Sequence, residues 1–294
     1  MAAWRALGVL IASLALTVEA SAALTPFRDG DLWGYEDEVG FRAIPAQFES
    51  AEGFSEGLAH VVIGGKHGFI NETGKAVIEP KFEDAGSFAE GAAPVKSGEK
   101  YGFIDTQGQD VIAPLYDEAR AFSQGMAAVR LGELWGYVRR DGELVVEPAY
   151  IEAGPFVEGL AVVRLPDRRA GVIDPWGNAV VEPQFEEIQP FAEGLAAVRQ
   201  GTRWGYVDRQ GRMVVVPQYD RAERFASGLA TVELGGATYV IDRSGNVAEQ
   251  VPARQSVEAT EVMSPEADEP DAERPSPADE ALPDDEDAPA EQLQ

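Results

Sequence analysis

The sequence has no cysteine, so no disulfide can staple the fold and no thiol can serve as a nucleophile or metal ligand. It has only two histidines, which leaves few groups for acid–base chemistry near neutral pH. Its longest apolar run, 13 residues near the start, is shorter than the roughly 20 that a membrane-spanning helix needs. Apolar burial must therefore hold the core together, and the material for common catalytic sites is scarce.

Positive charge is also scarce, with 24 Lys and Arg against 51 Asp and Glu and a formal net charge of −27. Residues 252–294 carry −12 of this charge and residues 1–22 none, which leaves −15 on residues 23–251. An acidic surface repels phosphate backbones and anionic lipids. We therefore expect neither nucleic acid nor a membrane surface as a partner.

The two ends of the chain differ from its middle. Arg5, the apolar run Ala6–Val18 and the small residues Ala20-Ser21-Ala22 have the layout of a secretory signal peptide, which predicts cleavage before Ala23 and a periplasmic or secreted protein. The alternative, an uncleaved anchor, is disfavoured by the short apolar run. Residues 252–294 hold seven prolines, 14 acidic residues and no aromatic residue, which predicts a disordered acidic tail.

Between these ends, residues 23–251 repeat with a period of about 34 residues. Glycines recur at spacings of 34, 34, 34, 35 and 34, and a proline and a phenylalanine keep the same register. The three series are Gly34, Gly68, Gly102, Gly136, Gly171 and Gly205; Pro45, Pro80, Pro114, Pro148, Pro183 and Pro217; and Phe54, Phe88, Phe122, Phe156, Phe191 and Phe225. Such a period indicates a tandem array of one supersecondary unit.

Each period is expected to contribute three strands, as the stretch 101–137 illustrates. Residues 101–105 form the first strand, and Asp105 and Gly108 fit the first and last positions of a type I turn. Residues 110–113 form the second strand, which Pro114 ends because it has no amide proton to donate. A link then buries Tyr116 and Phe122, and residues 126–131 form the third strand.

A tight hairpin at Leu131-Gly132-Glu133-Leu134 leads directly into the next period. The folding unit is therefore a three-stranded antiparallel meander that straddles the repeat boundary, and residues 23–251 hold seven of them. One meander buries too little apolar surface to be stable alone, so neighbours must pack in sequence. We expect an all-β tandem-repeat protein stacked as an open superhelical array, with a closed propeller-like ring as the alternative.

Three motifs in this pattern, Trp33-Gly34-Tyr35, Trp135-Gly136-Tyr137 and Trp204-Gly205-Tyr206, resemble the signature of bacterial WG-repeat proteins. The resemblance covers roughly residues 32–250. Its departures are His67, Tyr101 and Ala170 in place of tryptophan, Tyr239 in place of glycine, and Asn71 and Arg139 in place of the turn aspartate. The resemblance implies β-rich, often exported repeat modules with no shared catalytic activity.

A search for catalytic, cofactor or metal residues finds no convincing set, so none is assigned. His67 occupies the aromatic position before Gly68, and His60 lies in a predicted strand without an evident partner. The turn aspartates at 105, 174, 208 and 242 invite a calcium hypothesis, but each turn offers one carboxylate where calcium needs 6 to 8 oxygen ligands. We interpret them as turn caps.

Aromatic residues that recur in every copy are interpreted as core, because every copy must pack against the next one. Trp176 breaks this rule, since it is the one tryptophan predicted to lie in a turn, and it is our single candidate for a ligand contact. The sequence favours a non-enzymatic binding module for a protein or envelope glycan. The alternatives are a structural spacer or scaffold and, more remotely, a hydrolase using carboxylates such as Glu187 or Asp220. No feature specifies an oligomeric state.

Overall fold

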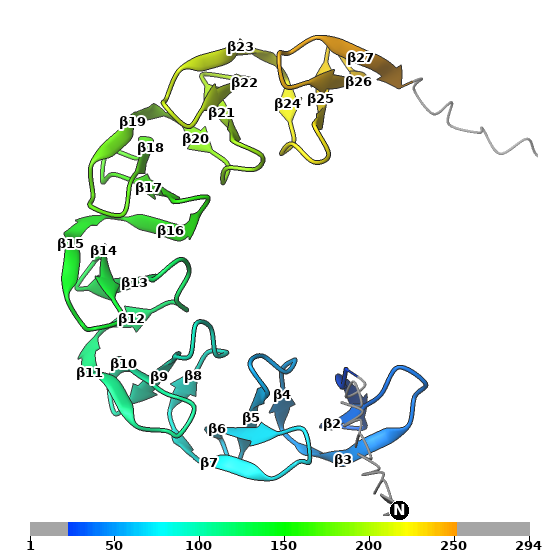
Figure 1. Ribbon diagram of the computed structural model, residues 1–294, viewed down its shortest axis with the longest axis vertical. Coiled ribbons are helices and arrows are strands. Elements are labelled where there is room, and N and C mark those ends of the chain that lie inside the picture. Colours follow the sequence, from blue (N-terminus) through cyan, green and yellow to red (C-terminus); the bar gives the residue numbers. More distant parts are fainter. Residues whose placement is uncertain (1–22, 252–294) are drawn as a thin grey trace, which may run out of the picture. The chain divides into compact units, whose positions relative to one another are not determined.

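The computed structural model describes residues 23–251, which form strands and turns and contain no helix, and hence none that could cross a membrane. The strands make seven small antiparallel sheets, one for each predicted meander (Figure 1). The predicted signal peptide, residues 1–22, and the predicted acidic tail, residues 252–294, lie outside the described residues. The prediction of an all-β tandem array is confirmed.

Each sheet is built from strands that are consecutive in the chain. The first sheet contains β1 (Thr25–Asp29), β2 (Leu32–Glu36) and β3 (Arg42–Phe48); the second contains β4 (Ser50–Ala51), β5 (Leu58–Ile63), β6 (Lys66–Asn71) and β7 (Ala76–Phe82). The third contains β8 (Asp84–Ala85), β9 (Ala93–Ser97), β10 (Lys100–Ile104) and β11 (Asp110–Tyr116); the fourth contains β12 (Glu118–Ala119), β13 (Met126–Leu131), β14 (Leu134–Arg139) and β15 (Leu144–Tyr150). The fifth contains β16 (Glu152–Val157), β17 (Leu160–Arg164), β18 (Ala170–Ile173) and β19 (Ala179–Phe185); the sixth contains β20 (Glu187–Ile188), β21 (Leu195–Gln200), β22 (Arg203–Asp208) and β23 (Met213–Tyr219). The seventh contains β24 (Arg221–Ala222), β25 (Leu229–Leu234), β26 (Ala237–Asp242) and β27 (Val247–Val251).

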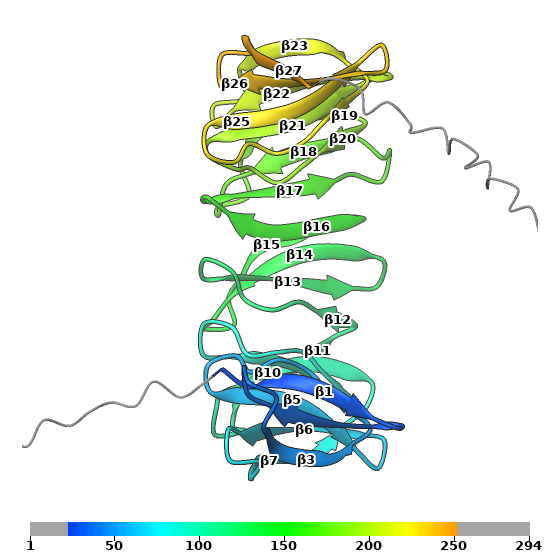
Figure 2. The same cartoon turned by 90° about the vertical axis from the view of Figure 1, so that its right-hand side faces the viewer.

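The sheets follow one another in chain order, as the green fourth and fifth sheets show in Figure 2. No strand of the first sheet pairs with a strand of the seventh among the residues described, so the row is open, as predicted, and the ring alternative is wrong. After the last strand of one sheet, a single residue leads into the first strand of the next. Successive sheets are therefore neighbours along the row.

Two details of the predicted meander are wrong. Six of the sheets described have four strands, because the start of each link pairs with the following hairpin, as Ala119 does with Val129. In five of these sheets that strand is only two residues long, too short to show an alternating pattern in the sequence. The strand with the proline also continues past it, as β11 does past Pro114. This strand lies at the edge of its sheet, where a missing amide donor breaks no ladder.

The recurring glycine lies beneath an irregularity in the edge strand. Trp135 pairs with Tyr150 and Tyr137 pairs with Val146, so two residue steps on β14 match four on β15. The extra residues pass so close to Gly136 that a Cβ there would lie 2.2 Å from the Val146 carbonyl oxygen. A bulge of this kind needs glycine on the facing strand.

Apolar contact between successive sheets forms the core. One cluster combines Met126, Trp135 and Tyr137 of the fourth sheet with Phe156 and Val163 of the fifth. The aromatic residue after the glycine repeatedly packs on the phenylalanine of the following sheet, with ring centroids 4.8 to 5.0 Å apart. The pairs are Tyr35–Phe54, Phe69–Phe88, Phe103–Phe122, Tyr137–Phe156 and Tyr206–Phe225. The recurring aromatics are thus core, as predicted.

A ladder of polar side chains also joins successive sheets. The residue before the glycine of each link turn has a positive φ of 52° or 53°, and in the first five of these six turns its side chain accepts a hydrogen bond from backbone amides one period later. The accepting residues and their donors are Glu56 with Gly91, Glu90 with Gln124 and Gly125, Gln124 with Gly159, Glu158 with Gly194, and Glu193 with Gly228. Part of the acidic composition therefore serves the architecture.

The turn aspartates cap their own turns, as predicted. Asp242 Oδ1 accepts the amides of Ser244 and Asn246, each at 2.9 Å, and Asp105 and Asn71 do the same in their turns. The Asn246 side chain and amide hold the pKa of Asp242 below its usual range. These carboxyl oxygens are engaged by backbone donors, which is what a turn cap requires.

Candidate functional site

The fifth sheet differs from its two neighbours in three ways. Ala170 stands where the fourth and sixth sheets have Trp135 and Trp204, and Gly154 stands where the fourth sheet has Arg120. The hairpin between β17 and β18 spans residues 165–169, whereas the corresponding hairpin in the fourth sheet has two residues. Among the copies described, the five-residue hairpin occurs in the fifth sheet alone, and a feature of one copy is the pattern expected of a functional position in a repeat array.

In the fourth sheet, large side chains stand at the positions that Ala170 and Gly154 have in the fifth. The Trp135 side chain is only 6% exposed, and the Arg120 guanidinium carbon lies 4.5 Å from the centroid of its ring. Arg120 also donates to the Ala153 carbonyl oxygen of the fifth sheet at 2.8 Å. An indole and a guanidinium, stacked by a cation–π interaction, therefore cover this part of the fourth sheet.

In the fifth sheet neither group is present. Ile188 packs on Ala170 in one buried cluster and stands where the links of the fifth and seventh sheets have Ala153 and Ala222, and a hollow of about 240 Å³ lies beside this pair. Ala170 and Ile188 are both buried next to it, and Gly154 and Val162 contribute to its walls. Arg164 lies at its rim and also lines two adjoining hollows of about 370 and 310 Å³. The hollow is lined by the charged residues Arg120, Glu152 and Arg164 as well as by apolar ones.

Arg164 is held in place by several acceptors. Its Nε donates to Glu152 Oε2 at 2.8 Å, and its Nη1 donates to the carbonyl oxygens of Arg168 and Glu186 at 2.9 and 2.8 Å. These bonds position the guanidinium before any ligand arrives and leave its flat face as the part available for contact. Such preorganisation lowers the cost of binding.

The long hairpin adds two further guanidinium groups. Arg168 has a positive φ of 69°, which is uncommon for a residue other than glycine, and its side chain is exposed. Within residues 23–251 the Arg168 guanidinium makes no hydrogen bond or ion pair, whereas Arg169 donates to the Gln184 carbonyl oxygen at 2.8 Å. The hairpin therefore presents a free cation in a domain of charge −15.

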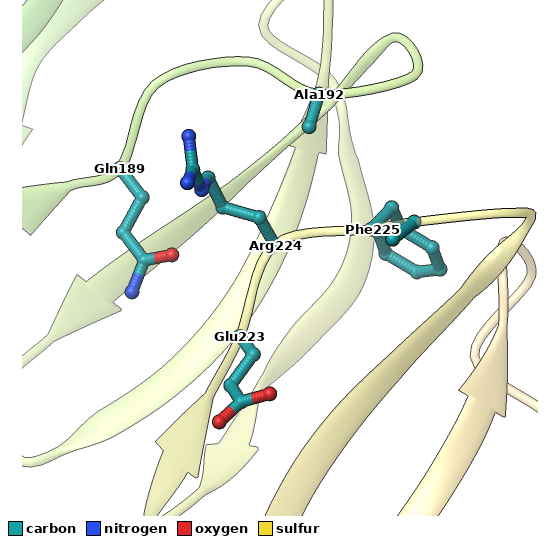
Figure 3. Close-up of a pocket in the computed structure, with 6 residues that line it drawn as sticks. Gln189, Ala192, Glu223, Arg224 and Phe225 are labelled. Carbon is teal, nitrogen blue, oxygen red and sulfur yellow. The ribbon is translucent and has the colours of Figure 1, made fainter. Parts of the chain in front are cut away.

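Another hollow, of about 440 Å³, lies between the links of the sixth and seventh sheets (Figure 3). Gln189 and Ala192 line one side of it, and Glu223, Arg224 and Phe225 line the other; the Arg224 guanidinium extends toward the Gln189 segment (Figure 3). Two successive links form these walls, and every pair of successive sheets has two such links. The fifth-sheet hollow lies beside the hairpin that is longer than its counterparts in the other described copies, so it is the stronger candidate.

The structure separates the residues that the sequence singled out. Trp176 lies in the turn after β18, 75% exposed, at the opposite end of that strand from Ala170, so it is accessible but outside the hollow. Its role as a contact stays a prediction. Glu187 is paired with Arg199 at 3.3 Å, whereas Asp220 accepts the Gly235 amide at 2.7 Å and pairs with Arg203. The two carboxylates therefore have different partners, and Arg199 and Arg203 both belong to the sixth sheet.

The two histidines, by contrast, lie together, which the sequence pattern did not predict. His60 Nε2 and His67 Nδ1 are 2.8 Å apart, and the two rings stack with centroids at 4.9 Å. Burial lowers the pKa of His60, which is 6% exposed, and Glu52 and Asp84 lie 3.8 and 3.6 Å from the pair. Across residues 23–251 no three His, Asp or Glu side chains are arranged to hold a metal ion. His60 on β5 and His67 on β6 are diagonal neighbours across this strand pair, and that register was the signal that could have revealed the contact.

These features define an open tandem β-repeat protein. The chain belongs to the family described as WG containing repeat, whose model matches residues 33–66, 68–101, 101–135, 135–165, 171–201 and 204–236, more than half of the chain. The longest interruption inside the matched region, residues 166–170, falls in the divergent hairpin and on Ala170.

Several solved structures are similar to the chain at low sequence identity. A eukaryotic initiation factor is 12% identical with a TM-score of 0.53, over 79% of this chain and 74% of that one. BamB from Moraxella catarrhalis is 11% identical with a TM-score of 0.42, over 77% and 87% of the two chains. AztD from Citrobacter koseri is 13% identical with a TM-score of 0.39, over 78% of each chain. No curated protein matches the chain in sequence.

Proposed function

We propose that the protein is a non-enzymatic binding module of the bacterial envelope or the cell exterior, and that the fifth sheet is the place where its partner docks. The observation that carries this proposal is the five-residue hairpin of the fifth sheet, which presents the free cation of Arg168 next to Ala170, where other copies have an aromatic side chain. The other copies retain the groups that hold the array together, so they supply a rigid frame for this site.

The partner class is a protein or an envelope glycan. Arg168 and Arg169 offer donors to carboxylates or sugar hydroxyls, and the adjoining hollows around Arg164 extend the contact area. The remaining surface is strongly acidic, which suppresses non-specific association with anionic molecules.

Site-specific photo-crosslinking tests this function. A photoreactive residue at position 168, in the fifth-sheet hairpin, is compared with the same residue at position 133, in the corresponding hairpin of the fourth sheet. We expect a discrete cross-linked species from position 168 in an envelope extract, and saturable binding when that species is purified and titrated. Equal products from both positions, or none from either, would refute a dedicated site on the fifth sheet.

Export is a separate part of the proposal and has its own test. The arrangement of Arg5, Ala6–Val18 and Ala20-Ser21-Ala22 supports a cleaved signal peptide. Amino-terminal sequencing of the mature chain, isolated after cell fractionation, should give a sequence that starts at Ala23. A chain recovered from the cytoplasm with residues 1–22 intact would contradict export while leaving the binding site unaffected.

A further inference from the structure

We propose that the turn between β2 and β3 docks a partner protein that offers an apolar recess bordered by lysine or arginine side chains. The turn comprises residues 37–41 of the first sheet, so this surface is separate from the fifth-sheet site and goes beyond the proposed function. Two large apolar side chains of the turn, Val39 and Phe41, are 88% and 68% exposed. The partner's recess would receive this apolar pair.

The later sheets have polar side chains at these two positions, with one exception. The residues in place of Phe41 are Lys75, Gln109, Glu143, Asn178, Arg212 and Asn246, and those in place of Val39 are Thr73, Gln107, Asp141, Trp176, Gln210 and Ser244. A single exposed apolar residue is ordinary on a protein surface. Two on one turn occur, among the copies described, in the first sheet alone, and the later turns form without them.

Asp37 fixes the backbone that carries the apolar pair. Its Oδ1 accepts the amides of Val39 and Phe41 at 3.0 and 2.8 Å. Its own amide donates to the Phe41 carbonyl oxygen, and its carbonyl oxygen accepts the Gly40 amide, both at 3.0 Å. The turn therefore has its binding shape before a partner arrives, which lowers the entropic cost of association.

The turn lies at the open end of the row of sheets. The glycine that corresponds to Gly40 in each later turn lies against the preceding sheet, where an added Cβ would come within 4 Å of an isoleucine or valine. A Cβ added to Gly40 meets nothing within 4 Å, because no sheet precedes the first among the residues described. An apolar side chain that enters a recess of a partner from such an accessible place is the arrangement of a binding hot spot.

The charge around the turn specifies the border of the recess. Residues 36–38, at the start of the turn, are all acidic. The two arginines of the first sheet are paired elsewhere, Arg42 with Asp29 at 2.6 Å and Arg28 with Asp31 at 3.5 Å. In the described part of the chain no Lys or Arg pairs with residues 36–38, so a partner with cations around its recess gains electrostatic complementarity.

The same charge disfavours occupants supplied by the chain itself. A second copy would bring another domain of charge −15, and residues 252–294 carry −12, so the acidic turn repels both. Anionic lipid is disfavoured for the same reason. A different protein with a basic border around an apolar recess is the occupant that fits.

A soluble analogue of this recess is β-cyclodextrin, whose cavity is apolar, with an ammonium group on each glucose unit. Titrated into the mature chain and followed by two-dimensional NMR, it should give saturable shifts of the Val39 and Phe41 amides. Neutral β-cyclodextrin should bind there roughly three-fold more weakly, because the acidic residues then have no cations to meet. Absence of saturable shifts at these amides, or tighter binding of the neutral form, would overturn the proposal.

The double variant Val39→Thr, Phe41→Asn isolates the apolar pair without changing the charge. Thr73 and Asn246 occupy these positions in the second and seventh sheets, so the variant should fold and keep its melting temperature. It should bind the cationic cyclodextrin about ten-fold more weakly than the native chain. Equal binding by the two chains would show that charge alone attracts the probe and would sink the inference.

The natural partner is tested by photo-cross-linking in a whole-cell extract, with the photoreactive residue at position 41 or at the matched position 75 of the second sheet. We expect one protein from position 41; once identified and purified, it should bind the double variant about ten-fold more weakly than the native chain and lose affinity as salt is raised. No product from position 41, equal products from both positions, or equal affinity for the two chains would refute the docking role. A product from position 168 without one from position 41 would remove this inference and leave the proposed function standing.

Discussion

The ring of Phe156 meets the ring of Tyr137 nearly edge-on, with centroids 5.0 Å apart and planes inclined at 67°. Tyr137 belongs to the fourth sheet and Phe156 to the fifth, so this contact joins two copies of the repeat. Burial also raises the pKa of Tyr137, whose hydroxyl donates to the Gly154 carbonyl oxygen at 2.7 Å. The neutral phenol thus adds a hydrogen bond to the contact between sheets.

Phe156→Ala should lower the free energy of unfolding by about 3–5 kcal/mol, because it removes a fully buried ring and leaves a cavity between the sheets. Urea denaturation followed by circular dichroism measures the loss. Phe156→Leu, which retains much of the volume, is the control and should cost clearly less. If Phe156→Ala lost less than about 1 kcal/mol, the ring pair would not contribute to cohesion as we describe.

Gly136→Ala should destabilise the chain by more than about 2 kcal/mol, because its Cβ would lie 2.2 Å from the Val146 carbonyl oxygen and the bulge of β15 would have to move. The matched control is Gly53→Ala, where a Cβ meets nothing within 4 Å and φ is not positive; its effect should stay within about 0.5 kcal/mol. Thermal unfolding followed by far-ultraviolet circular dichroism, which reports on the strands, compares the two.

The seventh sheet already shows how the fold accommodates a side chain at this position. Tyr239 replaces the glycine, and Thr238 and Tyr239 pair in regular register with Val251 and Gln250. The bulge opposite the glycine position is therefore absent from that sheet. A Gly136→Ala chain as stable as the native protein would show that the bulge does not need glycine.

Glu90→Ala should cost on the order of 1 kcal/mol, because the Gln124 and Gly125 amides of the next sheet lose their acceptor. Glu90→Gln should cost less, since Gln124 performs the same role for Gly159 through its Oε1 at 2.6 Å. Chemical denaturation of the two variants decides between an accepting oxygen and a negative charge as the requirement. Equal losses for both variants would show that charge matters more than the hydrogen bond.

The repeat pattern predicted most of the fold, because its signals are local and recur in every copy. Gly136 and Pro148 mark a strand and its neighbour, and Asp242 marks a turn that its own side chain caps. The continuation of strands past proline was missed, since whether Pro114 interrupts a ladder depends on its being at a sheet edge, which one period of sequence does not reveal.

The candidate site was predicted less well, because it depends on large side chains that the fifth sheet lacks. Ala170 appeared in the sequence only as a departure from the family pattern, and a hollow follows only if no neighbour fills the space. Gly154 and Ala170 are 16 positions apart in the sequence. They line the same hollow only because β16 and β18 belong to one sheet. Trp176, the residue that the sequence favoured, lies in the same sheet at the other end of β18.

His60 supplies a prediction that concerns pH. Burial lowers the pKa of its imidazole, Glu52 and Asp84 oppose this effect, and His67 adds to it. The unfolded chain, where histidine has a pKa of about 6.5, therefore binds a proton more readily than the folded chain. The stability that follows from this difference is complete above about pH 6.5 and is lost as the pH falls toward the folded-state pKa.

His60→Ala should flatten the dependence of stability on pH between about 6.5 and 5, a window above the usual pKa values of carboxylates. Ala128 and Ala197 occupy the corresponding positions in the fourth and sixth sheets, so the array accommodates the smaller side chain. Trp176→Ala, at an exposed turn, is the control and should parallel the native curve. Urea midpoints measured at half-unit steps of pH give the comparison, and a His60→Ala curve parallel to the native one would show that another group carries the titration.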